Sequence, residues 1–294
     1  DLSLDRLMNR YTMAVIYYSL NLPRIKKQLF ETENECDWIG VTCSAFGKIT
    51  KINLQNLGLN GTIPSEIQYF AGTLTHVDFS ENDIYGEIPD GLYKLRNLNY
   101  LYLHHNKLTG TLSSKVSTWK PLKDLYLGNN EFIGQIPVEI LTLQKLRFFI
   151  LHNNKFTGQI PFNIGNMVNL FYLDLSYNEL AGTLPPSLVM CKKLRHVYLD
   201  HNMLAGPIPS FYGRLGNYWL IDLTLDSNQL VGGVPEDWGD RKKLLSLKVQ
   251  DNNLSWKIPK ELCNLWAPDG EGELVELGAD CRICDCHFCK GRCY

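Results

Sequence analysis

The sequence has little that would mark a membrane or nucleic-acid-binding protein. Its longest apolar stretch near the N-terminus, "MAVIYY" (Met13–Tyr18), is far shorter than the roughly 20 residues that cross a bilayer. No basic segment followed by an apolar one is present, so we expect that any signal peptide has already been removed. The net charge of −2 provides no excess that favours nucleic acid or an anionic membrane. We therefore expect no nucleic-acid partner and no membrane span in this chain.

Sequence motifs of catalysis are also lacking. The chain contains no Gly-rich phosphate loop, no HExxH, no nucleophile elbow and no pair of carboxylates at a usable spacing. We therefore expect no enzyme activity, no catalytic residue and no cofactor. The alternative is an active site assembled from residues that are far apart in the sequence.

Cysteine is nearly absent from the middle of the chain and is concentrated at its ends. Cys36 and Cys43 lie near the start and Cys191 stands alone. The remaining six are Cys263, Cys281, Cys284, Cys286, Cys289 and Cys293. Clusters at both ends indicate disulfide-closed caps and an oxidising compartment, with Cys263–Cys281 as the expected first link of the second cluster. The alternative there is zinc, because CxxC and CxC spacings with His287 suit thiolate ligation.

In contrast, the chain is rich in an internal repeat. "LNYLYLHHNKLTGTL" from Leu98 recurs as "LKDLYLGNNEFIGQIP" from Leu122 and "LRFFILHNNKFTGQIP" from Leu146. The repeat starts are Ile49, Leu74, Leu98, Leu122, Leu146, Leu170, Leu194, Leu220 and Leu244. Successive starts from Leu74 to Leu194 are 24 residues apart. This period lies in the leucine-rich-repeat range, in which each repeat adds one strand to a curved solenoid.

The frame LxxLxLxxNxLxGxIP explains the common letters. Alternating leucines put one face of a short strand into the core, and the intervening residues face outward. The Asn ends the strand, where its amide can bond the turning backbones of neighbouring repeats. These residues are Asn82, Asn106, Asn130, Asn154, Asn178, Asn202, Asn228 and Asn252. The pattern predicts an α/β repeat solenoid, a leucine-rich-repeat superhelix with a concave parallel β-sheet.

The LxGxIP signature resembles the plant-type extracellular leucine-rich-repeat family of receptors and secreted inhibitors. "CDWIGVTC" is similar to the N-terminal cap motif of that family, which implies a disulfide between Cys36 and Cys43. The tail "ADCRICDCHFCKGRCY" departs from the usual plant cap and resembles the cysteine-rich ends of secreted algal proteins with these repeats. The resemblance implies the fold and leaves the partner open, because this fold serves many partners.

The ends of the chain read as caps on one repeat array. Apolar residues spaced by three and four predict a helix before Cys36: Leu4, Leu7, Met8, Tyr11, Val15 and Tyr18. This helix would cover the exposed core edge of the first repeat. "LVELGADC" from Leu274 reads as a final half-repeat strand. We expect an N-terminal cap at residues 1–48, nine repeats at 49–262 and a disulfide-rich C-terminal cap at 263–294.

Three further residues have specific expectations. Cys191 occupies a repeat position that is otherwise filled by large apolar residues, which predicts a buried free thiol; a reactive or intermolecular cysteine is the alternative. Asn60 and Asn253 each begin an N-glycosylation sequon. Both lie where the chain leaves the expected concave strand, so we expect both to carry sugar.

The variable positions of LxxLxLxxN form the expected concave surface. They contain six of the seven histidines and several aromatic residues. The candidate binding residues are Tyr100, Tyr102, His104, His105, Tyr126, Phe148, His152, Tyr172, Asp174, His196, Tyr198, Asp200 and His201. Aromatic residues beside polar groups are typical of protein-binding surfaces. The alternative is that strands favour Tyr and Phe and that repeat duplication copied them.

Charge on this surface is uneven, and a metal site is not expected. Acidic residues exceed basic ones in the C-terminal half, which favours a cationic ligand segment.

His104 and His152 lie two repeats apart, roughly 9–10 Å at ordinary strand spacing, which is too far for one metal. His196, Asp200 and His201 are closer but lie on different faces or columns of one strand.

The sequence therefore predicts a secreted, extracellular, non-catalytic recognition module that binds a protein or peptide through its concave face. Two alternatives remain. One is a structural subunit of an extracellular filament, coat or wall assembly, packed through its convex side. The other is a polysaccharide-binding wall protein that uses its tyrosines as platforms.

Overall fold

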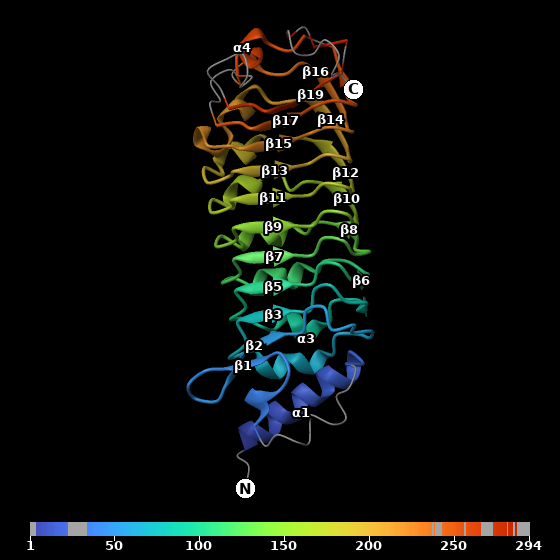
Figure 1. Ribbon diagram of the computed structural model, residues 1–294, viewed down its shortest axis with the longest axis vertical. Helices are drawn as coiled ribbons and strands as arrows, with labels where there is room; N and C mark the ends of the chain where they lie inside the picture. The colour runs from blue at the N-terminus through green and yellow to red at the C-terminus, as the bar shows by residue number, and fades with distance from the viewer. Residues whose placement is uncertain are drawn as a thin grey trace. The chain divides into compact units, whose positions relative to one another are not determined.

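The computed structural model describes residues 4–22, 34–236, 238, 243–255, 257–265, 273–280, 282–284 and 286. The chain folds as two compact units, Asp1–Leu146 and Arg147–Tyr294. Each unit is a stack of leucine-rich repeats, and each repeat contributes one strand to a parallel sheet (Figure 1). The predicted fold class is thus confirmed within each unit.

The first unit begins with helix α1 (Leu4–Ser19) and continues into a sheet of order β1-β2-β3-β5-β7. Its strands are β1 (Val41–Cys43), β2 (Ile49–Asn53), β3 (His76–Asp78), β5 (Tyr100–Tyr102) and β7 (Asp124–Tyr126). The first pair is antiparallel and the others are parallel. The other strands of this unit are β4 (Tyr85–Gly86), β6 (Lys107–Leu108) and β8 (Ile133–Gln135). The helical turns are η1 (Glu35–Asp37), η2 (Ser65–Phe70), α3 (Asp90–Tyr93), η3 (Ser114–Thr118) and η4 (Val138–Thr142).

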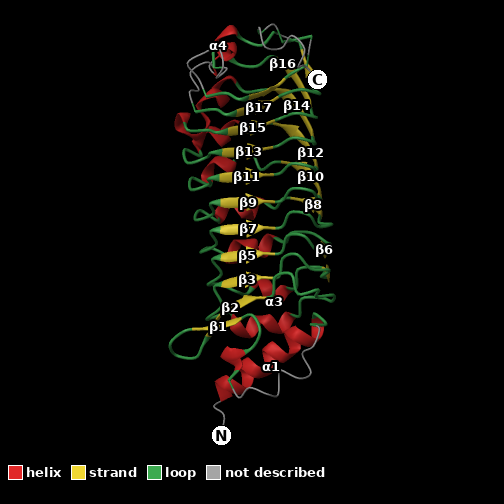
Figure 2. Cartoon of the chain, viewed as in Figure 1, coloured by secondary structure: helices red, strands yellow, loops and turns green. Residues whose placement is uncertain are grey.

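The second unit has two parallel sheets. The main sheet has the order β9 (Phe148–Ile150), β11 (Tyr172–Asp174), β13 (His196–Tyr198), β15 (Asp222–Thr224), β17 (Ser246–Lys248) and β19 (Glu276–Gly278). The other sheet contains β10 (Lys155–Gln159), β12 (Glu179–Thr183), β14 (Met203–Pro207), β16 (Gln229–Gly232) and β18 (Asn253–Leu254). Its described helical elements are η5 (Ile164–Asn166), η6 (Pro186–Met190), η7 (Ser210–Tyr218) and α4 (Lys260–Cys263). In Figure 2 the short helical turns of both units lie behind the main strands. Strand β19 confirms that the segment from Leu274 contributes a further strand.

The core and the asparagine ladder follow the repeat frame. In strands β3 to β17 of the main sheet the central apolar residue is buried; Leu101 and Leu173, for example, are fully shielded. Asn130 donates from Nδ2 to the carbonyls of Leu103 (2.9 Å) and Leu127 (3.1 Å) and accepts from the amide of Leu108 (3.0 Å). Each ladder amide thereby satisfies backbone groups that the turn leaves without strand partners.

The residue before each ladder asparagine has a left-handed backbone, which the repeat frame alone did not predict. These residues are Glu81, His105, Asn129, Asn153, Tyr177, His201, Ser227 and Asp251, and Asn56 has the same backbone before Leu57, which replaces the ladder asparagine in the first repeat. Asparagine tolerates this conformation, but bulky residues such as Tyr177 (φ 52°) adopt it at a cost. The position therefore combines an outward side chain with local backbone strain.

Helix α1 is present as predicted, but the predicted buried face is wrong. Leu4 and Leu7 are 74% and 54% exposed, whereas Met13, Ile16 and Tyr17 are buried. The helix packs on η1 and η2 with the Tyr17 side, where the Tyr17 hydroxyl donates to the carbonyl of Ile39 at 2.6 Å. Burial follows this fit to the first repeat rather than the longest apolar stripe.

The disulfides confirm the N-terminal prediction and correct the C-terminal one. Cys36 is bonded to Cys43. Cys263 is bonded to Cys286, so the predicted Cys263–Cys281 link is wrong. The amide of Ile258 donates to the carbonyl of Ile283 (2.8 Å), and this contact draws the tail back toward α4. Cys284 is also disulfide-bonded, whereas Cys281, His287, Cys289 and Cys293 lie outside the described residues.

Cys191 is a buried free thiol, as predicted. Its Sγ lies 3.5 Å from the carbonyls of Ile164 and Met167. Burial raises the pKa of the Cys191 thiol to about 12. The side chain therefore acts as a small apolar packing group.

Candidate functional site

The candidate site is the outward side of the main strands, which we call the strand face. In β5 the central Leu101 is buried, while Tyr100 and Tyr102 on either side of it are half-buried and face outward. The same alternation occurs in β3, β7, β11, β13 and β17. The frame therefore places each variable side chain at a defined height and spacing on the sheet.

In the first unit, the strand face carries an aromatic cluster made of Tyr100, Tyr102, His104 and Tyr126, which we call the Tyr102 cluster. The Tyr102 ring lies 5.0 Å from Tyr126, edge to face, and 6.4 Å from Tyr100. His104 lies 5.7 Å from Tyr126 and 6.3 Å from Tyr102. His76 stacks on Tyr100 at 4.3 Å. These separations are those of attractive aromatic pairs, so the rings hold one another in place.

Polar and charged side chains on the neighbouring strand contact the rings of the Tyr102 cluster and help to hold them in place. The Tyr102 hydroxyl donates to Asp124 Oδ2 at 3.1 Å. Burial and the Asp124 carboxylate raise the pKa of Tyr102, so its hydroxyl stays protonated at neutral pH. Lys123 Nζ lies 5.8 Å from the centre of the Tyr100 ring. Burial, with the nearby Lys51 and Lys123, lowers the pKa of His76.

In the second unit, Phe148, Tyr172, His196 and Tyr198 form a comparable group, which we call the Tyr198 cluster. Tyr172 lies 6.2 Å from Phe148, 5.2 Å from His196 and 5.3 Å from Tyr198. Asp222 Oδ2 accepts the Tyr198 hydroxyl at 2.9 Å and lies 2.7 Å from His196 Nδ1. Burial, with the Tyr172 hydroxyl and the Asp222 carboxylate, raises the pKa of Tyr198. Each unit thus carries a tyrosine whose hydroxyl is held by a carboxylate from the next strand.

Acidic side chains surround the Tyr198 cluster. Asp174 Oδ1 accepts from the amide and hydroxyl of Ser176, and its Oδ2 lies 3.3 Å from His152 Nδ1. Asp200 and His201 follow the end of β13. The His201 imidazole stacks on the Tyr177 ring, with 4.0 Å between the ring centroids. This half of the strand face presents both aromatic rings and negative charge.

The structure brings the predicted site residues together as two groups, one in each unit. His105 contacts His104 at 5.6 Å between ring centroids. Ile150, which the repeat frame places among the outward residues, is 7% exposed and belongs to the core. Asp124 and Asp222 were not among the candidate residues, although both occupy outward positions of the frame. In both pairs the aspartate lies on the next main strand, two frame positions before the position that the tyrosine occupies. Both aspartates could therefore have been found by searching the sequence for a tyrosine and an aspartate in this relation.

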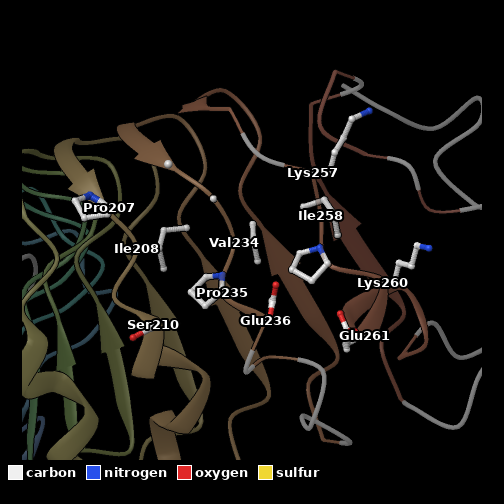
Figure 3. Close-up of a pocket in the computed structure, with 13 residues that line it drawn as sticks. Pro207, Ile208, Ser210, Val234, Pro235, Glu236, Lys257, Ile258, Lys260 and Glu261 are labelled. Atoms are coloured by element: carbon white, nitrogen blue, oxygen red, sulfur yellow. The ribbon is translucent and has the colours of Figure 1, made fainter.

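A pocket of about 670 Å³ lies elsewhere in the second unit (Figure 3). Its walls come from the LxGxIP segments of three repeats, and Ile208, Val234 and Ile258 each contribute one apolar side chain. Lys257 and Lys260 lie at its margin in Figure 3. These segments follow the ladder asparagines, so the pocket is separate from the strand face.

Two other features bear on where the protein acts. Asn60 and Asn253, the sequon asparagines, are both exposed. Among the residues that the structure describes, no helix has the length and apolar character needed to span a membrane.

The Leucine Rich Repeat family model matches residues 73–95, 97–119, 145–167, 169–191 and 243–265. A curated relative, the LRR receptor-like serine/threonine-protein kinase GSO2 of Arabidopsis thaliana, is 39% identical over 89 residues. That match covers 30% of this chain and 7% of the relative. The chain therefore spans only a small part of the length of the curated relatives that it matches.

Solved structures match far more of the chain. The leucine-rich-repeat ectodomain of the plant membrane receptor kinase GASSHO1/SCHENGEN3 from Arabidopsis thaliana, in complex with CASPARIAN STRIP INTEGRITY FACTOR 2, is 31% identical with a TM-score of 0.81. The match covers 92% of this chain and 33% of that one. The ectodomain of the Arabidopsis receptor kinase HAESA, in complex with an N-terminally extended IDA peptide hormone ligand, is 26% identical with a TM-score of 0.74. It covers 94% of this chain and 50% of the other. The chain carries leucine-rich repeats and is homologous to the plant extracellular leucine-rich-repeat receptor-like proteins.

Proposed function

We propose that this chain is an extracellular, non-catalytic recognition module that binds an extended peptide segment along the strand face. The segment is either a free peptide or part of a larger protein. The Tyr102 cluster provides an anchoring surface in the first unit, and the Tyr198 cluster provides one in the second unit. The exposed sequons at Asn60 and Asn253 and the disulfide between Cys36 and Cys43 support an extracellular location.

The observation that carries the proposal is the presence of two aromatic clusters on the outward side of the main strands. The hydrophobic core does not require aromatic residues there. The repeat core is closed by the frame leucines, and the clusters lie on the other side of the same strands. Half-buried tyrosines offer large apolar area together with a hydroxyl, and they lose little conformational freedom on binding. Such residues dominate the binding energy of protein interfaces.

Strained positions support the same conclusion. Tyr177 and His201 occupy the left-handed site that asparagine fills at Asn129 and Asn153. Their side chains stack on each other at 4.0 Å beside the Tyr198 cluster. A residue kept in an unfavourable conformation without a packing need in the core is a candidate for function.

The related structures support a peptide as the ligand class. The HAESA ectodomain was solved with a peptide hormone, and it shares 26% of its sequence with this chain over the aligned region. The match covers only 50% of the HAESA ectodomain, so the ligand of that protein does not identify the ligand of this chain. We therefore infer the partner from the surface of this chain. In the second unit Asp174 and Asp222, which are half-buried on the strand face, favour a segment that carries positive charge there.

The test is selection of a displayed library of short random peptides on the immobilised wild-type protein. The selected peptides are then titrated against Tyr102→Ala and Tyr198→Ala. Exposed aromatic residues outside the strand face provide matched controls, namely Tyr69→Ala in η2 and Phe162→Ala before η5. Loss of an anchor should weaken binding by about 2 kcal/mol, or roughly thirtyfold, whereas the controls should bind like wild type.

Two outcomes would overturn the proposal. If no peptide is enriched while wall polysaccharides bind in the same buffer, the strand face is a carbohydrate platform. If the Tyr69→Ala or Phe162→Ala variant loses binding instead, the contact surface lies on the far side of the repeats, as expected of a structural subunit.

A further inference from the structure

Three side chains at the ends of β13 and β15 converge on one point. Asp200 and His201 follow β13, and Asp226 follows β15. One potential ligand atom from each residue lies within 4.8 Å of the other two. His201 Nδ1 is 3.1 Å from Asp200 Oδ2 and 4.0 Å from Asp226 Oδ2. His196, which precedes Asp200 and His201 in the sequence, is bound to Asp222, and Asp226 completes the group instead.

Asp226 is the unusual member of this group. Its residue is 6% exposed, and its Oδ1 is buried without a hydrogen-bond partner among the residues that the structure describes. Its Oδ2 faces the imidazole of His201, so the carboxylate points into the cluster. A buried carboxylate oxygen without a partner is costly, because it has lost the water that would stabilise its charge.

Nearby protein groups offer Asp226 little compensation. Asp200 is a second carboxylate of the cluster, and His201 Nδ1 lies 4.0 Å from Asp226 Oδ2. The Lys248 ammonium is bound to Glu276 Oε1 at 2.8 Å. Two carboxylates therefore face each other across a partly exposed histidine, and the site has a net demand for positive charge.

We propose that Asp200, His201 and Asp226 bind a divalent metal ion and that Zn²⁺ is preferred over Ca²⁺ and Mg²⁺. An imidazole with two carboxylates suits zinc, whereas calcium takes six or more oxygen ligands. Ligand atoms around a tetrahedral zinc lie about 3.3 Å apart, for bonds of about 2.0–2.1 Å. The two distances from His201 Nδ1 to the carboxylate oxygens, 3.1 and 4.0 Å, bracket that value, and all three ligand atoms lie within 4.8 Å of one another. Side-chain movement would bring them to the zinc spacing.

The surrounding contacts hold these ligands in position. The Thr224 hydroxyl donates to Asp200 Oδ1, which leaves Asp200 Oδ2 facing His201. The Tyr177 ring lies nearly parallel to the His201 imidazole, with 13° between their planes. Such supporting contacts fix the orientation of metal ligands. With three protein ligands, the fourth position of the metal is left for water or for a donor atom of a bound partner.

The test is calorimetric titration of the non-reduced protein with zinc chloride in the absence of any peptide. We expect one tight site that Ca²⁺ and Mg²⁺ do not fill at the same concentration. His201→Asn should weaken zinc binding more than about tenfold, because a direct ligand is lost. Asparagine occupies the equivalent left-handed position at Asn129 and Asn153, so this variant should fold. The matched control is His105→Asn, which changes the same repeat position of the first unit and should leave zinc affinity unchanged.

A second readout uses Asp226→Asn. Without metal, this variant should unfold at a higher temperature than wild type, because one of two facing buried carboxylates is neutral. Zinc should raise the unfolding temperature of wild type but not of Asp226→Asn. Equal zinc affinity in wild type and His201→Asn, or no zinc-dependent rise in wild type, would overturn the metal site. Because no peptide is present, neither result bears on peptide binding.

Discussion

At the scale of single residues, Tyr102 and Tyr198 show how the strand face is organised in advance. Each hydroxyl donates to a carboxylate on the next strand, Asp124 or Asp222, and each ring is flanked by other aromatic groups. A side chain that is already held in place loses less rotamer entropy when a ligand covers it. The raised pKa of both tyrosines keeps these hydroxyls as donors through neutral pH.

His76 provides a pH-dependent prediction at this scale. Its pKa is lowered in the folded state, first by burial and then by Lys51 and Lys123. Protonation therefore favours the unfolded chain, so the stability that neutral His76 supports is present above the ordinary pKa of about 6.5 and is lost as pH falls below it. His76→Phe keeps a ring on Tyr100 and cannot be protonated. Thermal unfolding at a series of pH values should fall less steeply below pH 6.5 in this variant, and identical profiles would contradict the account.

Tyr177 provides a prediction about strain. Its left-handed backbone costs about 1–3 kcal/mol, and its stack on His201 returns about 0.5–1.5 kcal/mol. Tyr177→Asn should therefore stabilise the protein by up to about 1 kcal/mol in chemical denaturation. The reverse change at the same repeat position of the first unit, Asn129→Tyr, should destabilise it. A less stable Tyr177→Asn variant would show that the tyrosine serves stability.

At the scale of the repeat element, the ladder asparagine links one turn to the next. Asn178 donates to the carbonyls of Leu151, Leu175 and Ser176 and accepts from the amide of Phe156. Asn178 is only 9% exposed, so water could not easily take the place of its side chain as a partner for these backbone groups. The frame residue thus satisfies backbone polarity that neither sheet can satisfy.

The corresponding prediction concerns Asn178→Ala. Leaving several buried backbone groups without partners should reduce the free energy of unfolding by about 2–4 kcal/mol. Asn163→Ala is the matched control, because Asn163 is exposed at the start of η5 and its side chain makes no capping hydrogen bond. Denaturant titration of both variants measures the difference. Similar losses at the two positions would show that the ladder bonds contribute little.

Features that follow from the regular spacing of the repeat could be predicted from the sequence. Features that depend on how side chains of different elements pack against one another could not. The strands, the ladder and the buried Cys191 follow from the 24-residue frame, because the same neighbours recur in every repeat. The buried side of α1 did not follow, since Leu4 and Leu7 form the clearer apolar stripe while Met13 and Ile16 fit the first repeat. The aromatic candidates were readable as outward positions, whereas their pairing with Asp124 and Asp222 depends on side-chain directions between strands.

At the scale of the whole molecule, each unit contains a disulfide between described cysteines. Cys36 joins Cys43 beside β1 in the first unit, and Cys263 joins Cys286 beside α4 in the second. Cys191, also in the second unit, is instead a buried free thiol. The disulfides and this thiol are compatible only if the thiol is kept away from disulfide exchange.

Alkylation tests this arrangement. Burial raises the pKa of Cys191 to about 12, so the folded protein should leave this thiol unmodified at neutral pH, whereas the denatured protein should react there. Peptide mapping without reduction should recover Cys36 joined to Cys43 and Cys263 joined to Cys286. Finding Cys191 cross-linked, or alkylated in the native state, would contradict the packing described for it.

The most direct test of the account is to locate a bound peptide by photo-crosslinking. A photoreactive phenylalanine analogue is placed singly at Tyr102, Tyr198, Tyr69 or Phe162, and a peptide selected on the wild-type protein is added and irradiated. We expect crosslinks from positions 102 and 198 and none from positions 69 and 162, because only the first two lie on the strand face. Crosslinks confined to positions 69 or 162 would place binding on the other side of the repeats and contradict the central claim.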